Sequence, residues 1–227
     1  MPLNLRVPNP SAYAGAVLPA VPTVAEVING VAGLVGLWDP GTVADGAVEQ
    51  LAPSFGPTTL LRSGAGVNKA TVGGLPAITF DAANTRLAAS WAAAGSPATA
   101  IMQFYIRETS ADFQNFFGPS GAPRLIYRSS GTIQWAGTSQ VNGITISPPL
   151  IGWHLAEIYV GASTARIIID GHEYTAAQAG NGNTALMFGT NPGAGNNTSI
   201  ALGKMFAANS DLYGTTAAQA VKTLMGA

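Results

Sequence analysis

The chain has few residues that could carry acid–base or metal chemistry, and those few are scattered. It contains two histidines, His154 and His172, and no cysteine among 227 residues. A zinc site needs histidine or cysteine ligands at short spacing, such as His-Glu-x-x-His, and neither histidine has such a neighbour. The sequence therefore predicts no metal site. We expect His172, which follows Asp170-Gly171, to be a solvated turn residue, and His154 to hydrogen-bond a neighbouring strand.

Carboxylates are the second kind of catalytic candidate, because glycoside hydrolysis needs two of them across one cleft. Glu157 stands alone among apolar residues, and Glu108 lies at the end of an apolar run. A polysaccharide lyase would instead need a tyrosine and a histidine over a basic cleft, and Tyr127, Tyr159 and His154 are the residues available for that role. Their spacing does not show that they converge. We therefore predict no catalytic residues and no enzyme.

Calcium is the one ion for which the sequence offers oxygen ligands in loops. The segments Asp39–Gly46 and Asp81–Asn84 contain carboxylates and an amide close together. The alternative is that these aspartates cap ordinary turns through hydrogen bonds to nearby backbone N–H groups, as aspartate commonly does. We therefore predict no cofactor, and these two segments alone do not support calcium.

Aromatic rings and amides are the residues that bind neutral sugars, because a ring face stacks on pyranose C–H bonds and amides pair with hydroxyl groups. Trp38 and Trp153 lie in apolar runs and are expected to be nearly buried. Trp91 or Trp135, which are flanked by small or polar residues, is expected to be partly exposed. Core packing for Trp135 and ordinary turns for the asparagine-rich loops are the alternatives. The candidate carbohydrate-binding residues are Trp91, Trp135, Asn181, Asn183, Asn196 and Asn197.

The composition excludes several classes of partner. Charged residues make up 9% of the chain and the formal net charge is −1, whereas an ordinary soluble domain has roughly 25% charged residues. A surface of this kind has little self-repulsion and suits a protein packed against neighbours. The ten lysines and arginines are dispersed, which argues against the basic stripe that nucleic-acid binding requires. No apolar run is long enough to span a membrane. We therefore expect neither nucleic-acid binding nor membrane insertion.

The first thirty residues differ in organisation from the rest. Residues 1–22 alternate prolines with small apolar residues, which favours an extended path, and they lack the basic start and unbroken apolar run of a signal peptide. Thr23–Glu26 is a capping box that begins a short helix, which Asn29-Gly30 ends. Extended apolar segments gain stability by lying along another subunit, so we predict that this arm contacts a second chain. Its candidate assembly residues are Leu3, Leu5, Val7, Tyr13, Val17, Leu18 and Val21.

Residues 31–227 are predicted to form one β-sandwich domain, and residues 1–30 an extended proline-rich arm with a short helix. The apolar runs after residue 30 are short and recur at roughly 8–12 residues with Gly, Pro, Asn and Ser between them, which is typical of an all-β sandwich. The longest run, Thr99–Glu108, is expected at the centre of a sheet, together with the hairpin Trp153–Asp170. The predicted strands are Val31–Trp38, Thr58–Leu61, Ala77–Phe80, Arg86–Ala89, Thr99–Glu108, Phe113–Phe117, Arg124–Arg128, Thr132–Ala136, Gly143–Ile146, Trp153–Val160, Arg166–Ile169, Ala185–Phe188 and Ser199–Met205.

The chain closes on a predicted helix over Thr215–Ala227. Thr216–Gln219 has the form of a second capping box. Apolar residues recur at helical spacing behind it, so we expect the helix to dock on the sandwich and cover an edge or a rim. The residues on its apolar face are Ala217, Ala220, Val221, Leu224 and Met225.

Five segments stand out in chain order: Leu34–Trp38, Gly74–Asp81, Trp153–Val160, Arg166–Gly171 and Ser199–Gly203. Together they resemble the concanavalin A-like (laminin-G-like) jelly-roll superfamily over roughly residues 31–213. In that superfamily an early strand holds a buried tryptophan, a tryptophan-containing hairpin ends in Asp-Gly, and a late strand ends in Leu-Gly. The resemblance implies a two-sheet antiparallel jelly-roll sandwich, here with an extended N-terminal arm and a short C-terminal helix.

The superfamily includes lectins, glucanases, polysaccharide lyases and modules of bacteriophage virions. The proline-rich arm and the low charge look most like the virion modules. The resemblance therefore implies a non-enzymatic structural protein on the exposed surface of a phage or phage-like virion, as a decoration, spike or fibre-associated component. Such a protein would be made in the host cytoplasm. It would bind other virion proteins through its arm and form a homo-oligomer, and host surface glycans are its possible ligands. The alternatives are a polysaccharide-active enzyme and a soluble carbohydrate-binding module.

Overall fold

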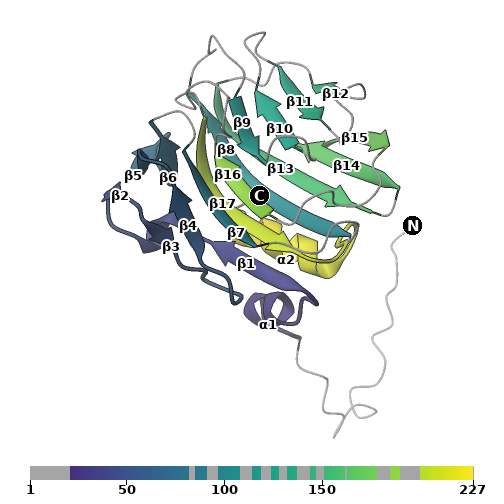
Figure 1. Cartoon of the computed structure of the whole chain (residues 1–227). Helices are drawn as coiled ribbons and strands as arrows, with labels where there is room; N and C mark the ends of the chain where they lie inside the picture. Colours follow the sequence, from purple (N-terminus) through teal and green to yellow (C-terminus); the bar gives the residue numbers. More distant parts are fainter. Residues whose placement is uncertain are drawn as a thin grey trace, which may run out of the picture.

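The protein is an all-β sandwich of two antiparallel sheets, with a short helix near each end (Figure 1). This confirms the predicted fold class. Within the described part of the chain, no helix is both long and apolar enough to cross a membrane. The computed structural model describes residues 21–81, 85–90, 97–107, 114–118, 124–127, 132–136, 144–146, 151–161, 163–177, 185–189 and 200–226.

The first sheet carries the three longest of the described strands, which lie side by side. Strand β8 lies between β13 and β17, and β1 pairs with β17 off the main path. In spatial order the sheet consists of β15 (His172–Ala177), β14 (Thr164–Ile169), β13 (Gly152–Val160), β8 (Ala98–Ile106), β17 (Ile200–Ala208), β6 (Leu75–Phe80), β5 (Val67–Val72) and β2 (Gly46–Ala47), with β1 (Leu34–Trp38) beside β17.

The second sheet faces the first across the main core. Its strands are shorter, and their middle members supply large apolar side chains to that core. In spatial order it consists of β12 (Ile144–Ile146), β11 (Ile133–Ala136), β10 (Arg124–Tyr127), β9 (Gln114–Phe117), β16 (Ala185–Gly189), β7 (Arg86–Ser90), β4 (Leu60–Ser63) and β3 (Gln50–Leu51).

The predicted strands are confirmed with shifts of one to a few residues at their ends, and β8 is central as expected. The hairpin Trp153–Asp170 was expected at the centre as well, and this is wrong. Strands β13 and β14 lie toward one edge, because the chain turns again at Asp170-Gly171 and adds β15 outside them. At this turn φ is +50° and +81°, the left-handed pair that a two-residue hairpin needs. His172 is exposed, but it begins β15 instead of lying in the turn.

The main core lies between the sheets and is built around large aromatic residues. Trp38 is fully buried, as predicted. Its indole Nε1 donates to the carbonyl of Thr58 at 2.8 Å, and its ring meets the edge of Phe188 at 6.0 Å between centroids. Phe80 and Phe104 are buried in the same cluster. The inward side chains of both sheets are thus removed from water, which supplies most of the driving force for folding.

A second, smaller core lies on the outer face of the first sheet, under the helices α1 (Val24–Asn29) and α2 (Thr216–Met225). Figure 1 shows both helices on this side of the sheet. Strand β8 therefore has apolar partners on both faces: Phe104 points into the main core, and Ile101 points toward the helices. This is why the sequence of β8 alternates imperfectly. Helix α2 covers the face of the sheet, not an edge or rim as predicted.

The two helix starts differ from each other. The capping box predicted at Thr23–Glu26 is confirmed, with both reciprocal hydrogen bonds present. The box predicted at Thr216–Gln219 is wrong by one residue. Thr215 is the N-cap and accepts from the backbone N–H of Ala218, so alanine occupies the position that a box needs for Glu or Gln.

The predicted assembly arm falls almost wholly outside the described residues. Leu3, Leu5, Val7, Tyr13, Val17 and Leu18 lie in residues 1–20, which the structure does not describe. Val21 is the one described member, and its side chain is 90% exposed. The contact with a second chain therefore stays a prediction.

Candidate functional site: a groove beside helix α2

Helix α2 is fixed to the sheet by polar side chains as well as by its apolar face. The side-chain amide Nε2 of Gln103 donates to the carbonyl of Met225 at 2.6 Å. The ammonium of Lys204 donates to the carbonyl of Leu224 at 2.7 Å. Carbonyls in the last turn of a helix have no partner within the helix, so these two strand residues satisfy them. The helix consequently ends at a defined position over β8 and β17.

Four hollows adjoin α2, three beside β13 and the fourth at the C-terminal end of the helix, and neighbouring hollows share lining residues. The first and second share Glu157 and Lys222, the second and third share Leu155 and Asp170, and the third and fourth share Gln103 and Trp153, among other residues. We call this row the α2 groove. It runs from Tyr213, just before the helix, to Trp153 and Lys204 near the helix C-terminus.

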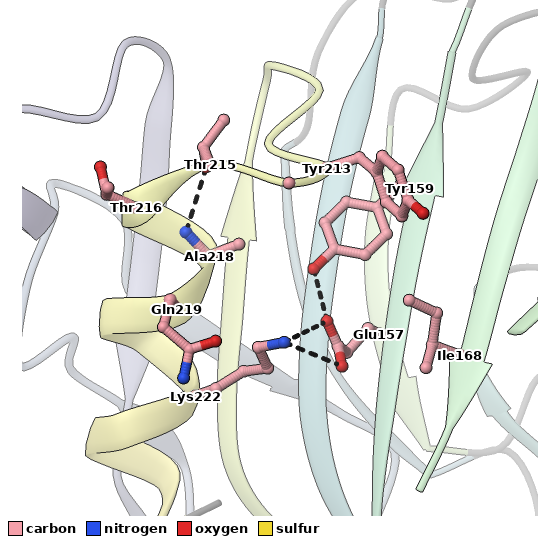
Figure 2. Close-up of a pocket in the computed structure, with 10 residues that line it drawn as sticks. Glu157, Tyr159, Ile168, Tyr213, Thr215, Thr216, Ala218, Gln219 and Lys222 are labelled. Carbon is pink, nitrogen blue, oxygen red and sulfur yellow. Dashed lines mark hydrogen bonds and ion pairs between the residues drawn. The ribbon is translucent and has the colours of Figure 1, made fainter. Parts of the chain in front are cut away.

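The first hollow has a volume of about 380 Å³ and contains a buried ionic cluster, drawn in Figure 2. Glu157, on β13, is 5% exposed. Its carboxylate accepts a hydrogen bond from the Tyr159 hydroxyl at 2.6 Å, and the Lys222 ammonium of α2 lies 3.3 Å from the same oxygen, Oε2. A carboxylate with so little exposure needs such partners, because burying a charge without them is costly. The isolated glutamate of the sequence is therefore paired from a distant helix.

Tyr159 and Tyr213 form the end wall of this hollow. Their rings meet edge to face at 5.4 Å between centroids. The Tyr213 hydroxyl donates to Glu173 at 2.7 Å, and the Arg166 guanidinium lies 4.3 Å from the centre of the Tyr213 ring. Tyr213 is still 40% exposed, so an aromatic ring marks this end of the groove.

The tyrosines here are held in their neutral form. Burial raises the pKa of Tyr159 far above its usual range, and the hydrogen bond to Glu157 raises it further. The hydrogen bond to Glu173 raises the pKa of Tyr213. Neither hydroxyl is set up to act as a base or nucleophile at neutral pH, since that role needs a pKa near or below the working pH. Among its described lining residues, this hollow holds one carboxylate, that of Glu157.

The fourth hollow, at the other end, is the largest of the row at about 600 Å³. Trp153 lines it, with its indole Nε1 donating to the Gly73 carbonyl at 3.2 Å and its ring against the edge of Tyr105. The carboxylate of Asp39 and the ammonium of Lys204 lie 3.7 Å apart on the opposite part of the lining. An aromatic ring, a few polar groups and this volume are typical of a small-molecule site.

The core prediction is wrong for Trp153, whereas Trp135 has the core packing that was given as its alternative. Trp153 was expected in the core but is only half-buried, because it lies on the outer face of β13 where α2 has already ended. Trp135 was expected to be a candidate for partial exposure and is fully buried between the sheets. It shares an inward face with Ile133, two residues before it, so it offers no ring to a sugar. Trp91 and the candidates Asn181, Asn183, Asn196 and Asn197 lie outside the described residues.

The residues considered for lyase chemistry do not come together. Tyr127 is buried in the core between the sheets, whereas Tyr159 lies on the outer face of the first sheet under α2. His154 packs on Phe104, and its Nδ1 lies 2.6 Å from Asp170 Oδ2, which is the contact with a neighbouring strand end that the sequence predicted. No acid–base pair across one cleft results.

The loops considered for calcium are stabilised by protein contacts. Asp39 accepts from the backbone N–H of Gly41 at 2.7 Å, which confirms the predicted turn cap, and Asp81 accepts from the side-chain amide of Asn68 at 2.6 Å. Asn84 lies outside the described residues. Over the residues that the structure describes, no group of three or more His, Asp or Glu side chains is placed to hold a metal ion.

Four residues of the groove were not singled out from the sequence: Gln103, Lys204, Tyr213 and Lys222. Their common feature is that they meet only where α2 and the turn before it pack on β13, β8 and β17: Tyr213 and Lys222 come from the turn and the helix, and Gln103 and Lys204 from the strands. Gln103 did carry a signal, because it is the one amide in the apolar run of β8. A buried polar residue in a central strand indicates a specific hydrogen-bond partner.

Comparisons with known proteins agree with this fold. No protein-family model matches the sequence, and no curated protein matches it significantly. Solved structures do match. The botulinum neurotoxin serotype D binding domain is 9% identical, with a TM-score of 0.60 over 86% of this chain and 52% of that one. Trypanosoma rangeli sialidase in complex with sialic acid is 14% identical, with a TM-score of 0.61 over 94% of this chain and 36% of that one.

A third match is similar in size to this protein. Domain 4 of a GH43 extracellular arabinanase from Geobacillus stearothermophilus, solved with arabinotriose, is 11% identical, with a TM-score of 0.55 over 84% of this chain and 98% of the domain. By contrast, the chain spans only about a third to a half of the toxin and sialidase structures. At these identities the likeness establishes the fold alone: this chain has the same kind of all-β sandwich.

Proposed function

We propose that the protein is a non-enzymatic carbohydrate-binding domain of the concanavalin A-like type, and that the hollow at Trp153 is its sugar site. The observation that carries the proposal is a half-buried indole lining a hollow of about 600 Å³ together with Asp39, Gln103 and Lys204. Indole rings stack on the C–H faces of sugars, and carboxylates and ammonium groups pair with hydroxyls.

Contacts with the protein fix the aromatic ring of this hollow. Its indole is held in place by the Gly73 carbonyl and the Tyr105 ring. A Cβ at Gly203 would lie 3.0 Å from Cζ3 of the ring, so the absence of a side chain there leaves the indole its place. A ring fixed in advance loses little conformational entropy on binding. The fold comparison adds support, because one matched domain was solved with arabinotriose.

The test is direct binding of neutral oligosaccharides, measured by calorimetry, with arabinotriose as the first probe and cello-, xylo- and malto-oligosaccharides beside it. We expect Trp153→Ala to weaken binding at least about tenfold, and Trp153→Phe to weaken it less. Leu61→Ala is the control, because Leu61 is 56% exposed on the other sheet. If the wild type bound none of these sugars, or if Trp153→Ala bound as well as Leu61→Ala, the proposal would be wrong.

The absence of catalysis is part of the same proposal. The carboxylate in the groove that most resembles a catalytic acid, Glu157, is tied to Tyr159 and Lys222, and retaining or inverting hydrolysis needs a second carboxylate across the bond. We expect no product from these polysaccharides in hydrolase or lyase assays. Reproducible product release that was lost in Glu157→Gln would overturn this part of the proposal.

We also infer a setting for the domain on the surface of a phage or phage-like virion. Two features of the sequence favour it: a charged fraction of 9%, and an arm at residues 1–22 that combines prolines with apolar residues. In this setting the arm would bind other virion proteins or a second copy of the chain. Deletion of residues 2–22 should leave the sandwich folded and abolish incorporation or oligomerisation. Wild-type assembly of the truncated protein would contradict the inference.

A further inference from the structure

We infer that the α2 groove binds an extended, uncharged oligosaccharide chain, with Trp153 holding one end and Tyr213 the other. This rests on the proposed function, because it starts from the sugar site at Trp153. It goes further by assigning a second contact at the far end of α2 and by naming the class of ligand as linear, neutral glycans of several units.

The four hollows adjoin one another along α2. Each shares lining residues with the next, so together they form a row from Tyr213 to Trp153. Helix α2 forms one wall along its whole length, and ten residues of helix span about 15 Å. That length is several times the width of one sugar ring. A single sugar at Trp153 would leave most of the groove empty.

The charged side chains of the groove already have partners within the protein. Its described lining contains three carboxylates, two ammonium groups and one imidazole; both ammonium groups lie in ion pairs, and the imidazole lies within hydrogen-bond distance of the third carboxylate. Asp39 pairs with Lys204, Glu157 with Lys222, and Asp170 with His154. A sialic acid or uronic acid is normally held by a cation that is free to face it. In this groove such a cation would have to leave its carboxylate, so neutral sugars fit better than acidic ones.

The side chains at the two ends and in the middle of the α2 groove are of types that bind neutral sugars. Aromatic rings, which bind sugars by stacking, lie at both ends: Trp153 at one and the 40% exposed Tyr213 at the other. Between them, the exposed side chain of Gln219 lines two adjoining hollows. An amide at that point offers both a donor and an acceptor to hydroxyl groups of intermediate sugars.

The experiment is a chain-length series with the neutral sugar that binds best, from the monosaccharide to the hexasaccharide, measured by calorimetry. We expect affinity to rise with length until the groove is filled. Tyr213→Ala should remove that rise, with at least about a fivefold loss for the longest oligomer and no change for the shortest. Trp153→Ala should weaken all lengths. A matched uronic-acid oligomer should bind at least about tenfold more weakly than the neutral one.

A variant that blocks the middle of the α2 groove tests whether one sugar chain occupies its whole length, or whether Tyr213→Ala acts by a nonspecific effect at one end. Gln219 is exposed on α2, so the Gln219→Trp variant should fold, with its indole filling the middle of the groove. Long oligomers should then bind this variant no more tightly than short oligomers do. Gln219→Ala is the matched control and should keep the length dependence.

The outcomes distinguish this inference from the proposed function. Sugar binding that needs Trp153 but does not depend on length, or that is unchanged in Tyr213→Ala and Gln219→Trp, would overturn the extended site and leave the Trp153 site standing. Tighter binding of the acidic oligomer would overturn the choice of neutral ligands. No binding of any sugar would overturn both.

Discussion

The side-chain amide of Gln103 lies between two partners: its Nε2 donates to the carbonyl of Met225 at 2.6 Å, and its Oε1 accepts from the backbone N–H of Lys204 at 2.9 Å. One residue of β8 thereby ties the end of α2 to β17. The wall of the groove depends on this contact, because the hollow at Trp153 is bordered by the last turn of the helix.

Replacing this amide should loosen the wall without unfolding the sandwich. Gln103→Met keeps the length of the side chain and removes both hydrogen bonds, so we expect the free energy of unfolding to fall by about 1–3 kcal/mol. Amide hydrogen exchange should rise in the last turn of α2 and stay unchanged in the core strand β6. Equal protection of α2 in the variant and the wild type would show that the apolar face alone fixes the helix.

The ion pair between Glu157 and Lys222 should contribute more than a surface pair. Their side chains are 6% and 26% exposed, so Lys222→Met leaves a buried carboxylate with only Tyr159 as its partner. We expect a loss of about 1–3 kcal/mol, below the value for a fully buried pair because Lys222 still reaches solvent. Adding Glu157→Gln to Lys222→Met should recover part of the loss, because the amide carries no charge.

The exposed pair of Arg62 and Glu49, with side chains 28% and 70% exposed, is the control for this prediction. Glu49→Gln should cost less than about 1 kcal/mol. Chemical denaturation of these three variants and the wild type measures each loss of stability. A double variant that was less stable than Lys222→Met would contradict the explanation by an uncompensated charge.

Much of the fold could be predicted from the sequence because turns and apolar runs are local signals. The hairpin of β13 and β14 shows this, since both strands are rich in apolar residues, Gly161 ends β13 and Asp170-Gly171 ends β14. Strand β5 was missed because its residues Asn68 and Lys69 are only partly buried, which leaves it little apolar periodicity. Its turn, Gly73-Gly74, has φ of +54° and +83° and is the signal that could have revealed the hairpin.

The groove could not be predicted in the same way, because it arises where distant segments meet. The placement of α2 over β8 depends on Ile101 facing the helices while its neighbours face the main core. Because the β8 sequence is apolar on both faces, it does not indicate which side chains face the main core and which face the helices. Trp153 illustrates the consequence. Its apolar neighbours suggested the core, but strand parity puts it outside with Glu157 and Tyr159.

The two fully buried tryptophans should respond differently to replacement by phenylalanine. Both are 0% exposed, but Trp38 donates to the Thr58 carbonyl at 2.8 Å, whereas Trp135 Nε1 has no hydrogen-bond partner among the described residues. Trp38→Phe removes the donor that the carbonyl uses. Trp135→Phe instead removes an unpaired buried donor, which is itself unfavourable. We expect Trp38→Phe to cost about 0.5–1.5 kcal/mol more than Trp135→Phe.

Denaturant unfolding of the two variants measures this difference directly, because each serves as the control for the loss of ring volume in the other. Equal losses would indicate that packing, not the hydrogen bond, sets the contribution of Trp38.

The buried hydroxyl of Tyr159 should make the protein sensitive to alkali. Burial and the Glu157 hydrogen bond raise its pKa well above the usual 10.0 in the folded state, while the unfolded chain ionises near that usual value. The folded state therefore binds more protons than the unfolded state at high pH. The stabilising contribution is complete below about pH 10 and is lost as the pH rises further.

Tyr159→Phe tests this. At neutral pH it should cost about 1 kcal/mol through the lost hydrogen bond, but its stability should fall less steeply between neutral and strongly alkaline pH than that of the wild type. Tyr213→Phe is the comparison, because that hydroxyl is also bonded to a glutamate but its ring is 40% exposed, and its effect on the alkaline slope should be smaller. The urea midpoint of each variant, measured across this pH range, gives its loss of stability in alkali. If Tyr159→Phe lost stability as steeply as the wild type, ionisation of Tyr159 would not cause the alkaline destabilisation.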